Sequence, residues 1–270
     1  MWKRSSCCPA GWIAYLKSRK SRGNLLNNRK QIVHRAIIFL HIEKTAGTSI
    51  SNLIAKAHDP EAMLRIGSTP ELMQILSKPS GKRYTAIMGH LFYGMHLFGL
   101  TYHPYAYYTM LRDPVDRLVS QYHYIRRTPG HHLHQLVNTN NLSLEQFART
   151  NHHANQQVIR LGFHIHHHGN RFEIGHTDKD ILVTAKHTLV HGVKHFGIYE
   201  HFDESIDRLS ALIGVSINAI PQENVSFNRQ KVADLDRSTL DLIRQGNALD
   251  MALYEFAKQV FKEGKTPLGF

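Results

Sequence analysis

The chain has 270 residues, 42% of them hydrophobic, which predicts one sizeable core in a single domain of α/β type. No apolar run reaches the roughly 20 residues of a membrane span, and the basic N-terminus lacks the pattern of a secretion signal. The two cysteines, Cys7 and Cys8, are adjacent and cannot form a disulfide framework, so we expect a reducing, cytoplasmic environment.

The formal net charge of +12 is concentrated at the start of the chain. Residues 1–35 contain nine Lys and Arg and no Asp or Glu, which leaves the rest of the chain close to neutral. We interpret residues 1–34 as a flexible basic arm. It is either a solvated tail or a segment that makes peripheral contact with an anionic membrane. Nucleic-acid binding is not expected, because the body of the chain has no base-reading or stacking motif.

The first predicted elements are a buried strand at 35–42 and a helix at 48–58. Two further strands, rich in β-branched and aromatic residues, are predicted at 84–90 and 105–111.

A strong helix start follows the strand at 105–111. Asp113 is expected to cap a helix whose first residue is Pro114. Helical spacing then places five apolar residues on one face, namely Val115, Leu118, Val119, Tyr122 and Ile125. On this helix we interpret Asp116 as a surface ion-pair partner and expect Arg117 to pair with Asp113 four residues before it.

The second half of the chain adds helices and one strand. The sequence SLEQ at 143–146 is typical of a capping box that opens a short helix. A late strand is predicted at 194–200, with amphipathic helices at 202–214 and 247–264. Strands that alternate with helices predict an α/β, P-loop-like three-layer fold with a central, mainly parallel sheet flanked by helices.

The loop after the first strand has the residues of a phosphate site, namely Lys44, Thr45, Ala46, Gly47, Thr48 and Ser49. A helix N-terminus binds anions through its unpaired N–H groups, and Gly47 allows close approach of the backbone. The pattern of nucleoside-triphosphate loops fails, since Ile42 stands at their first glycine and Thr48 at their lysine. Lys44 lies instead at the start of the loop, where it can reach the bridging oxygen of a 5′-phosphate ligand.

A second motif follows the strand at 105–111. Arg112 comes at the end of this strand, and Ser120 lies eight residues further on the next helix. Ligands of open α/β sheets bind at the carboxyl ends of the strands, so both motifs are expected to face one crevice. An arginine and a hydroxyl form a compact second phosphate clamp. The two clamps together fit 3′-phosphoadenosine 5′-phosphosulfate (PAPS) better than ATP.

Over residues 35–262 the chain resembles PAPS-dependent carbohydrate sulfotransferases, as a bacterial relative of heparan sulfate 2-O-sulfotransferase. The resemblance is carried by HIEKTAGTS (41–49), GHLFYGMH (89–96), LRDPVDRLVSQY (111–122), NQQ (155–157) and FGIYEHFDES (196–205). It implies a sulfotransferase domain at 35–264, followed by a tail at 265–270. The implied reaction moves a sulfuryl group from PAPS to an acceptor hydroxyl, expected to belong to a saccharide, and requires no metal.

The resemblance also implies roles for single residues. His90 is expected to be the catalytic base, and Lys44 to neutralise charge on the leaving 5′-phosphate. Arg229, in the loop at 224–231, is expected to contact the adenosine and 3′-phosphate. Substrate-binding roles are assigned to His96, Asn155 and Gln156.

Two positions depart from the family pattern. Glu43 stands where the family commonly has proline, and we expect it to alter the geometry of the loop more than its chemistry. Met88 stands where the 2-O-sulfotransferases have another histidine.

The chain contains 21 histidines, including clusters at 131–134, 152–153 and 164–168. Their spacing is not that of a closed zinc site, so we interpret them as surface or acceptor-cleft residues. Two alternatives to the sulfotransferase hypothesis stay open. One is a kinase-like nucleotide-dependent phosphotransferase, and the other is a catalytically inactive module that binds polyanions.

Overall fold

The computed structural model describes residues 36–78, 81–168, 171–175, 180–193, 195–215 and 230–264. The predicted basic arm, the predicted tail and Arg229 lie outside the described residues.

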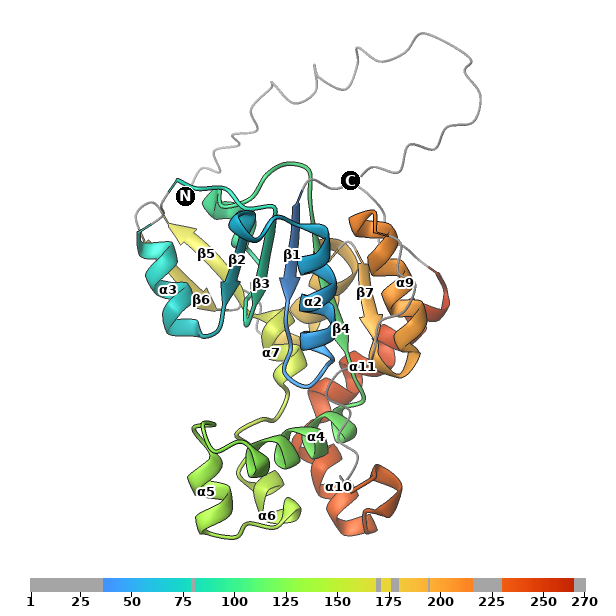
Figure 1. Ribbon diagram of the computed structural model, residues 1–270. Coiled ribbons are helices and arrows are strands. Elements are labelled where there is room, and N and C mark those ends of the chain that lie inside the picture. The colour runs from blue at the N-terminus through green and yellow to red at the C-terminus, as the bar shows by residue number, and fades with distance from the viewer. Residues whose placement is uncertain are drawn as a thin grey trace, which may run out of the picture. The chain divides into compact units, whose positions relative to one another are not determined.

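A parallel five-stranded sheet forms the centre of the described fold, in the strand order β2-β3-β1-β4-β7 (Figure 1). Its strands are β2 (Met63–Ile66), β3 (Ala86–Gly89), β1 (Ala36–Leu40), β4 (Tyr105–Leu111) and β7 (His195–Ile198). In the register, Ile38 of β1 pairs with Ile87 on one side and Tyr107 on the other. All five residues of β1 are buried, as expected of a central strand covered on both faces. The predicted fold class is confirmed.

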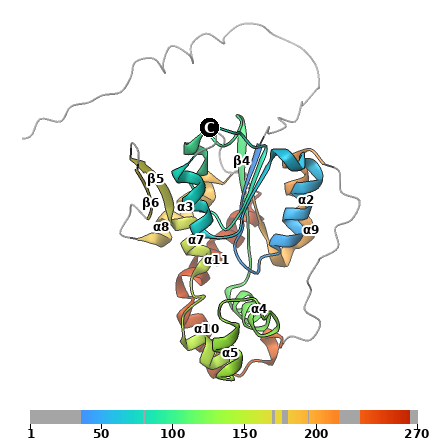
Figure 2. The same cartoon turned by 60° about the vertical axis from the view of Figure 1, so that its left-hand side comes forward.

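Helices cover both faces of the sheet (Figure 2). Ile38 and Leu40 belong to one apolar cluster, with residues of α3 (Thr69–Ser77), α7 (Gln156–Gly162), α8 (Ile181–His187) and α11 (Ala248–Lys262). Ile37 and Phe39 belong to the opposite cluster, with residues of α2 (Gly47–Ala57) and α9 (Phe202–Ile213). Successive strand residues thus alternate between two cores.

A third apolar cluster lies beyond the carboxyl ends of the strands (Figure 1). It joins α4 (Pro114–Arg127), α5 (His134–Thr139), α6 (Leu144–Arg149) and α10 (Arg237–Gly246). The five apolar residues predicted for one face of α4 are all buried in it, so that prediction is confirmed. The Asp113 carboxylate accepts hydrogen bonds from the N–H groups of Val115 (3.0 Å) and Asp116 (2.9 Å), which confirms the predicted cap. The capping box at Ser143 and Gln146 is present as well.

Several elements were not predicted. The strand β2 is short and partly exposed, so its four residues give little periodic signal. The histidine cluster at 164–168 forms β5 (His164–His168), which pairs with β6 (Arg171–Gly175) in an antiparallel hairpin apart from the main sheet. The shorter helical turns are Pro60–Ala62, Met95–Phe98, Thr188–Gly192, Tyr199–His201 and Val232–Asp234.

The topology brings three chain segments to one edge. Because β1 lies between β3 and β4, the residues that follow these parallel strands all emerge at their carboxyl ends. These are the loop after Leu40, His90 after β3, and Arg112 after β4. This is the edge at which open α/β sheets bind ligands.

Candidate active site

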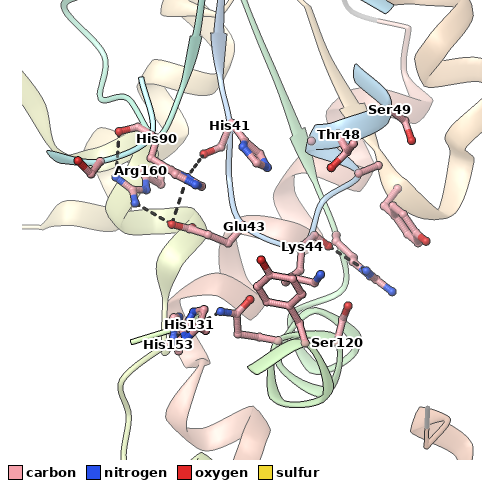
Figure 3. A pocket seen from close by; sticks show the side chains of 18 of the residues that line it. His41, Glu43, Lys44, Thr48, Ser49, His90, Ser120, His131, His153 and Arg160 are labelled. Carbon is pink, nitrogen blue, oxygen red and sulfur yellow. Dashed lines mark hydrogen bonds and ion pairs between the residues drawn. The ribbon is translucent and has the colours of Figure 1, made fainter. Parts of the chain in front are cut away.

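A pocket of about 690 Å³ lies at this edge (Figure 3). Its lining includes eight residues that the sequence predicted, namely Lys44, Ala46, Gly47, Thr48, Ser49, His90, Arg112 and Ser120. Of the other predicted site residues, Arg229 lies outside the residues that the structure describes. The remaining four, Thr45, His96, Asn155 and Gln156, are described but do not line the pocket.

The loop between β1 and α2 is tightly turned. Lys44 and Ala46 adopt positive φ angles of 67° and 64°, a left-handed conformation that costs energy for residues other than glycine. Thr45, between them, is fully buried, and its hydroxyl donates a hydrogen bond to the carbonyl of Ile42 at 2.8 Å. The Thr45 side chain therefore holds the shape of the loop.

The first turn of α2 faces the pocket. Ala46 is the N-cap residue of α2, and its methyl side chain has no oxygen to accept a hydrogen bond from the first N–H groups. Gly47, Thr48 and Ser49 follow it and line the pocket. The first turn of α2 contains no acidic residue. Its positive end is thus well suited to an anion.

His41 packs beneath this turn and was not predicted as a site residue. Its ring stacks on that of His90, with centroids 4.7 Å apart, and on that of Phe39 at 5.6 Å. A β-carbon at Gly47 would lie 1.8 Å from the Nε2 atom of His41. The buried His41 ring therefore favours glycine at position 47, since a larger residue would clash with it.

The free energy of unfolding is expected to depend on pH through His41. Burial, together with the neighbouring His90, lowers the pKa of His41 from 6.5 to about 3. The unfolded chain then takes up this proton first, so the stability of the fold falls as the pH drops from about 6.5 towards 3, by at most about 1.4 kcal/mol per pH unit. Urea unfolding at several pH values should show a weaker pH dependence for His41→Phe than for the unsubstituted protein. Equal pH dependence in the two proteins would contradict the expectation.

His90 contacts a carboxylate and a carbonyl through one ring nitrogen. Its Nδ1 atom lies 3.3 Å from Oε1 of Glu43 and 3.3 Å from the carbonyl oxygen of His41. The same Glu43 oxygen accepts a hydrogen bond from Nη2 of Arg160 at 2.8 Å (Figure 3). Glu43 was expected to affect loop geometry more than chemistry, and the structure places its carboxylate inside the pocket, in direct contact with His90.

Arg112 connects the two predicted clamps. Its Nη1 atom donates to the carbonyl of Lys44 at 2.8 Å, and its Nε atom donates to the carboxylate of Asp116 at 2.8 Å. Its guanidinium also stacks on the ring of Tyr199, 4.0 Å from the centroid. Ser120 lines the same pocket from α4. Asp116 is therefore an ion-pair partner, as predicted, but it is only partly exposed and its partner is the buried Arg112 of the pocket.

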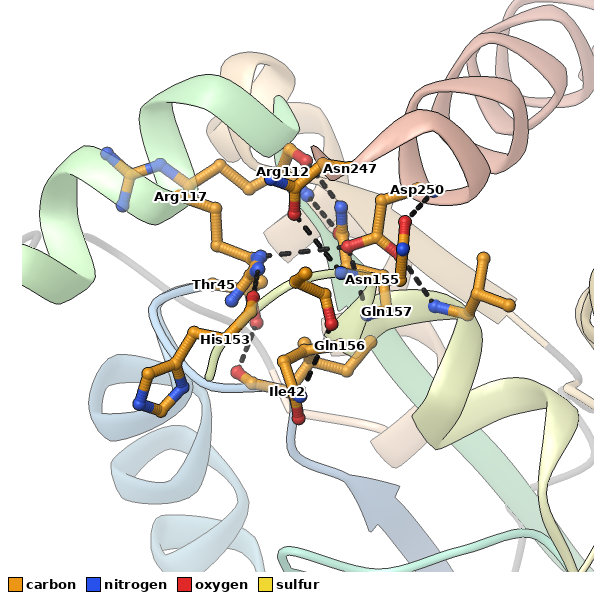
Figure 4. Close-up of polar contacts among 12 residues, drawn as sticks. Ile42, Thr45, Arg112, Arg117, His153, Asn155, Gln156, Gln157, Asn247 and Asp250 are labelled. Carbon is orange, nitrogen blue, oxygen red and sulfur yellow. Dashed lines mark hydrogen bonds and ion pairs between the residues drawn. The ribbon is translucent and has the colours of Figure 1, made fainter. Parts of the chain in front are cut away.

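A buried polar network holds the end of β4 in place (Figure 4). The Gln157 side chain accepts from the N–H of Arg112 and donates to its carbonyl, both at 2.9 Å. Asp250 of α11 accepts from the N–H groups of Gln157 (3.2 Å) and Val158 (2.8 Å). Asn155 accepts from the N–H groups of Leu249 and Asp250, each at 3.1 Å. The side chains of Gln157 and Asn155 thus link α7 to the end of β4 and to the start of α11.

Arg117 belongs to the same network. It is fully buried, lies 3.9 Å from Asp250 and donates to the carbonyl of His153 at 2.6 Å. The predicted pairing of Arg117 with Asp113 is therefore wrong. Burial raises the pKa of the Asp250 carboxyl against the opposing effect of Arg117. Gln156, the middle residue of the NQQ motif, donates to the carbonyl of Ala154 at 3.4 Å.

His96 lies outside the pocket lining and contacts residues near the start of β4. Its Nδ1 atom is 2.9 Å from the hydroxyl of Tyr107, and its ring stacks on that of Tyr105 with centroids 5.3 Å apart. Both tyrosines belong to the first half of β4, whereas Arg112 follows its last residue. The structure therefore places His96 outside the lining of the pocket in which the acceptor was expected.

Mostly aromatic and basic side chains of α4 and of the segment between α4 and α7 form another wall. This wall consists of Gln121, Tyr124, Arg127, His131, His132 and His153, and residues 67–69 at the start of α3 also line the pocket. The Nζ atom of Lys44 lies 4.2 Å from the centroid of the Tyr124 ring. Burial and the neighbouring Arg117 lower the pKa of His153 to about 4, so this histidine is neutral near pH 7. Three residues of the histidine clusters therefore line the pocket, which is one of the two placements that the sequence predicted for them.

Two further findings concern the described ranges as a whole. No group of three or more His, Cys, Asp or Glu side chains in these ranges is arranged to hold a metal ion. None of the helices in the part of the chain that the structure describes is long and apolar enough to cross a bilayer.

A family model described as "Sulfotransferase family" matches residues 33–257, and the chain belongs to this family. No curated protein matches the chain. Among solved structures, it is similar to mouse sulfotransferase SULT7A1, whose structure is titled as complexed with PAP. The two chains are 13% identical and superpose with a TM-score of 0.37, over 82% of this chain and 65% of the mouse chain.

Proposed function

We propose that this protein transfers a sulfuryl group from PAPS to a hydroxyl group of a carbohydrate acceptor. The observation that carries the proposal is the convergence of two anion-binding motifs on one pocket. Lys44 and the first turn of α2 lie at one of them, and Arg112 and Ser120 lie at the other. Membership of the sulfotransferase family supports the same reaction.

The two motifs suit the two ends of the donor. The first turn of α2 offers N–H groups and a positive dipole to the 5′-phosphosulfate. A guanidinium has five N–H donors, and the bonds of Arg112 to Asp116 and to the Lys44 carbonyl leave further donors for a 3′-phosphate. We assign Arg229 to the adenosine end on the basis of the sequence alone.

Lys44 has a distinct role in the proposed reaction. Its ammonium, beside the Tyr124 ring, is placed to neutralise the charge that develops on the leaving 5′-phosphate. Its carbonyl is held by Arg112, so occupation of the 3′-phosphate site is coupled to the position of the Lys44 loop. A kinase-like reaction is less well supported, because Thr48 stands where triphosphate loops have their lysine.

The donor is tested by ligand-induced thermal stabilisation. We expect 3′,5′-bisphosphoadenosine to raise the melting temperature far more than AMP or ATP at the same concentration, with a rise that grows with concentration. The reason is that only the bisphosphate fills both anion sites. Equal stabilisation by AMP would contradict the choice of donor, and stronger stabilisation by ATP with Mg²⁺ would favour the phosphotransferase alternative.

The acceptor is tested by a transfer assay with radiolabelled PAPS. A panel of saccharides should accept label, and phenols and other small alcohols serve as comparison substrates. Absence of transfer to any hydroxyl compound, with bisphosphate binding intact, would favour the inactive polyanion-binding alternative. Peripheral membrane contact through residues 1–35 and a cytoplasmic location stay predictions from the sequence.

A further inference from the structure

The contacts of His90 determine which of its ring nitrogens carries the proton. Nδ1 lies 3.3 Å from two oxygens, Oε1 of Glu43 and the carbonyl oxygen of His41. A carbonyl oxygen and an ionised carboxylate are acceptors only. A neutral His90 ring therefore places its proton on Nδ1, where both oxygens accept it. Nε2 is left with a lone pair.

Glu43 is ionised, as this tautomer requires. Burial alone would raise the pKa of Glu43, but Arg160 and then His90 outweigh burial and lower it to about 2. Arg160 reaches Glu43 from α7 at 2.8 Å, and its guanidinium is itself packed over the ring of Phe92, 5.0 Å from the centroid. The carboxylate is thus held between a fixed arginine and the imidazole.

We propose that Glu43 is a positioning residue that fixes the tautomer of His90 and thereby makes Nε2 the basic atom of the reaction. This inference rests on the proposed sulfuryl transfer. The acceptor O–H proton moves to Nε2 while the acceptor oxygen forms a bond to sulfur. The bond from sulfur to the 5′-phosphate oxygen breaks, and its electron pair leaves with that phosphate. The imidazolium formed at His90 lies against the Glu43 carboxylate, which stays ionised throughout.

The neighbouring charged and titratable groups agree with this arrangement. His41 stacks on His90 and is kept neutral by burial, so it does not compete for a proton near pH 7. Lys44 follows Glu43 directly in the loop and lies over Tyr124, whereas Glu43 contacts Arg160. The loop thus directs two neighbouring charged residues to different places. Lys44 lies in the proposed donor site, and the Glu43 carboxylate lies beside His90, the proposed base.

A purely structural ion pair between Glu43 and Arg160 would have no effect on the tautomer, so the tautomer is the quantity to measure. Imidazole ¹⁵N spectra of the full-length protein, with the His90 signals assigned by their loss in His90→Ala, report which nitrogen is protonated. We expect Nδ1 to be protonated and Nε2 unprotonated in the neutral ring. In Glu43→Gln, whose amide can donate to Nδ1, the population should shift towards Nε2–H.

The second test measures turnover and bisphosphate binding in the same Glu43→Gln variant. Glu43→Gln is expected to lower kcat by about 10- to 100-fold, as is typical when the partner of a functional histidine is lost. The Kd for 3′,5′-bisphosphoadenosine should stay within about twofold. Glu145→Gln is a matched control, because it removes the same charge from an exposed i,i+4 pair with Arg149, remote from the pocket lining. It should leave the tautomer, kcat and Kd unchanged.

Each outcome decides the inference. An Nε2–H tautomer in the unsubstituted protein would overturn it, and this measurement needs no variant to fold. A Glu43→Gln protein that keeps its tautomer, or that shifts its tautomer without loss of turnover, would overturn it equally. Failure of the unsubstituted protein to transfer sulfate would refute the proposed reaction instead, since the spectra are read without any acceptor.

Discussion

Replacement of His90 with alanine is expected to lower turnover by about 100-fold or more, the usual consequence of losing a general base. The expected cause is specific, because the imidazole is the group that follows β3 into the pocket and is oriented there by Glu43 and the His41 carbonyl. The affinity for 3′,5′-bisphosphoadenosine should not change, since His90 is not part of either proposed phosphate clamp. Turnover with an acceptor from the screen and calorimetric binding of the bisphosphate measure the two quantities separately.

His96→Ala provides the matched control. It removes a second histidine from the same segment, but one that contacts Tyr107 and lies outside the pocket lining. We expect its turnover to be close to that of the unsubstituted protein at a temperature where both are folded. Near-normal turnover of His90→Ala would show that His90 is a structural histidine. Loss of bisphosphate binding in the same variant would instead mean that the end of β3 is disturbed.

Arg112→Ala is expected to weaken bisphosphate binding by about 30- to 150-fold. A charge-assisted contact between Arg112 and the 3′-phosphate is worth on the order of 2–3 kcal/mol. The variant also loses the bond to the Lys44 carbonyl, so the loop at the other clamp is less well fixed. AMP lacks the 3′-phosphate, and its affinity should fall much less. The preference for the bisphosphate over AMP is therefore expected to disappear, as calorimetry with both ligands would show.

The Arg112→Ala variant also leaves Asp116 without its ion-pair partner, and a second substitution at Asp116 controls for this effect. Without Arg112, the Asp116 carboxylate would face the ligand phosphate uncompensated. Arg112→Ala combined with Asp116→Asn removes this repulsion, and we expect it to recover part of the lost affinity but none of the preference over AMP. Ser120→Ala removes a single hydroxyl from the clamp and should cost about 1 kcal/mol of binding free energy. An Arg112→Ala protein that keeps its preference for the bisphosphate would place the 3′-phosphate elsewhere.

Much of the framework was determined by the sequence alone. The strand at 105–111 and the Asp113–Pro114 helix start are encoded by neighbouring residues, through β-propensity and a local cap. The order of strands and helices along the chain predicts a parallel sheet, and the carboxyl ends of such a sheet share one edge. For this reason the sequence is sufficient to assign the phosphate loop, His90 and Arg112 to one pocket.

The tertiary structure alone decided which side chains meet in that pocket. Arg160 is 117 residues from Glu43, and Asp250 is more than 90 residues from the backbone groups that it accepts from. No local pattern encodes such pairs, because they depend on where α7 and α11 pack. The sequence accordingly did not predict that Glu43 contacts His90, that His96 lies outside the pocket lining, or that the ion-pair partner of Asp116 is the buried Arg112. A charged or titratable side chain takes its role from the partners that the packed helices bring within a few ångströms, and these partners exist only in the folded chain.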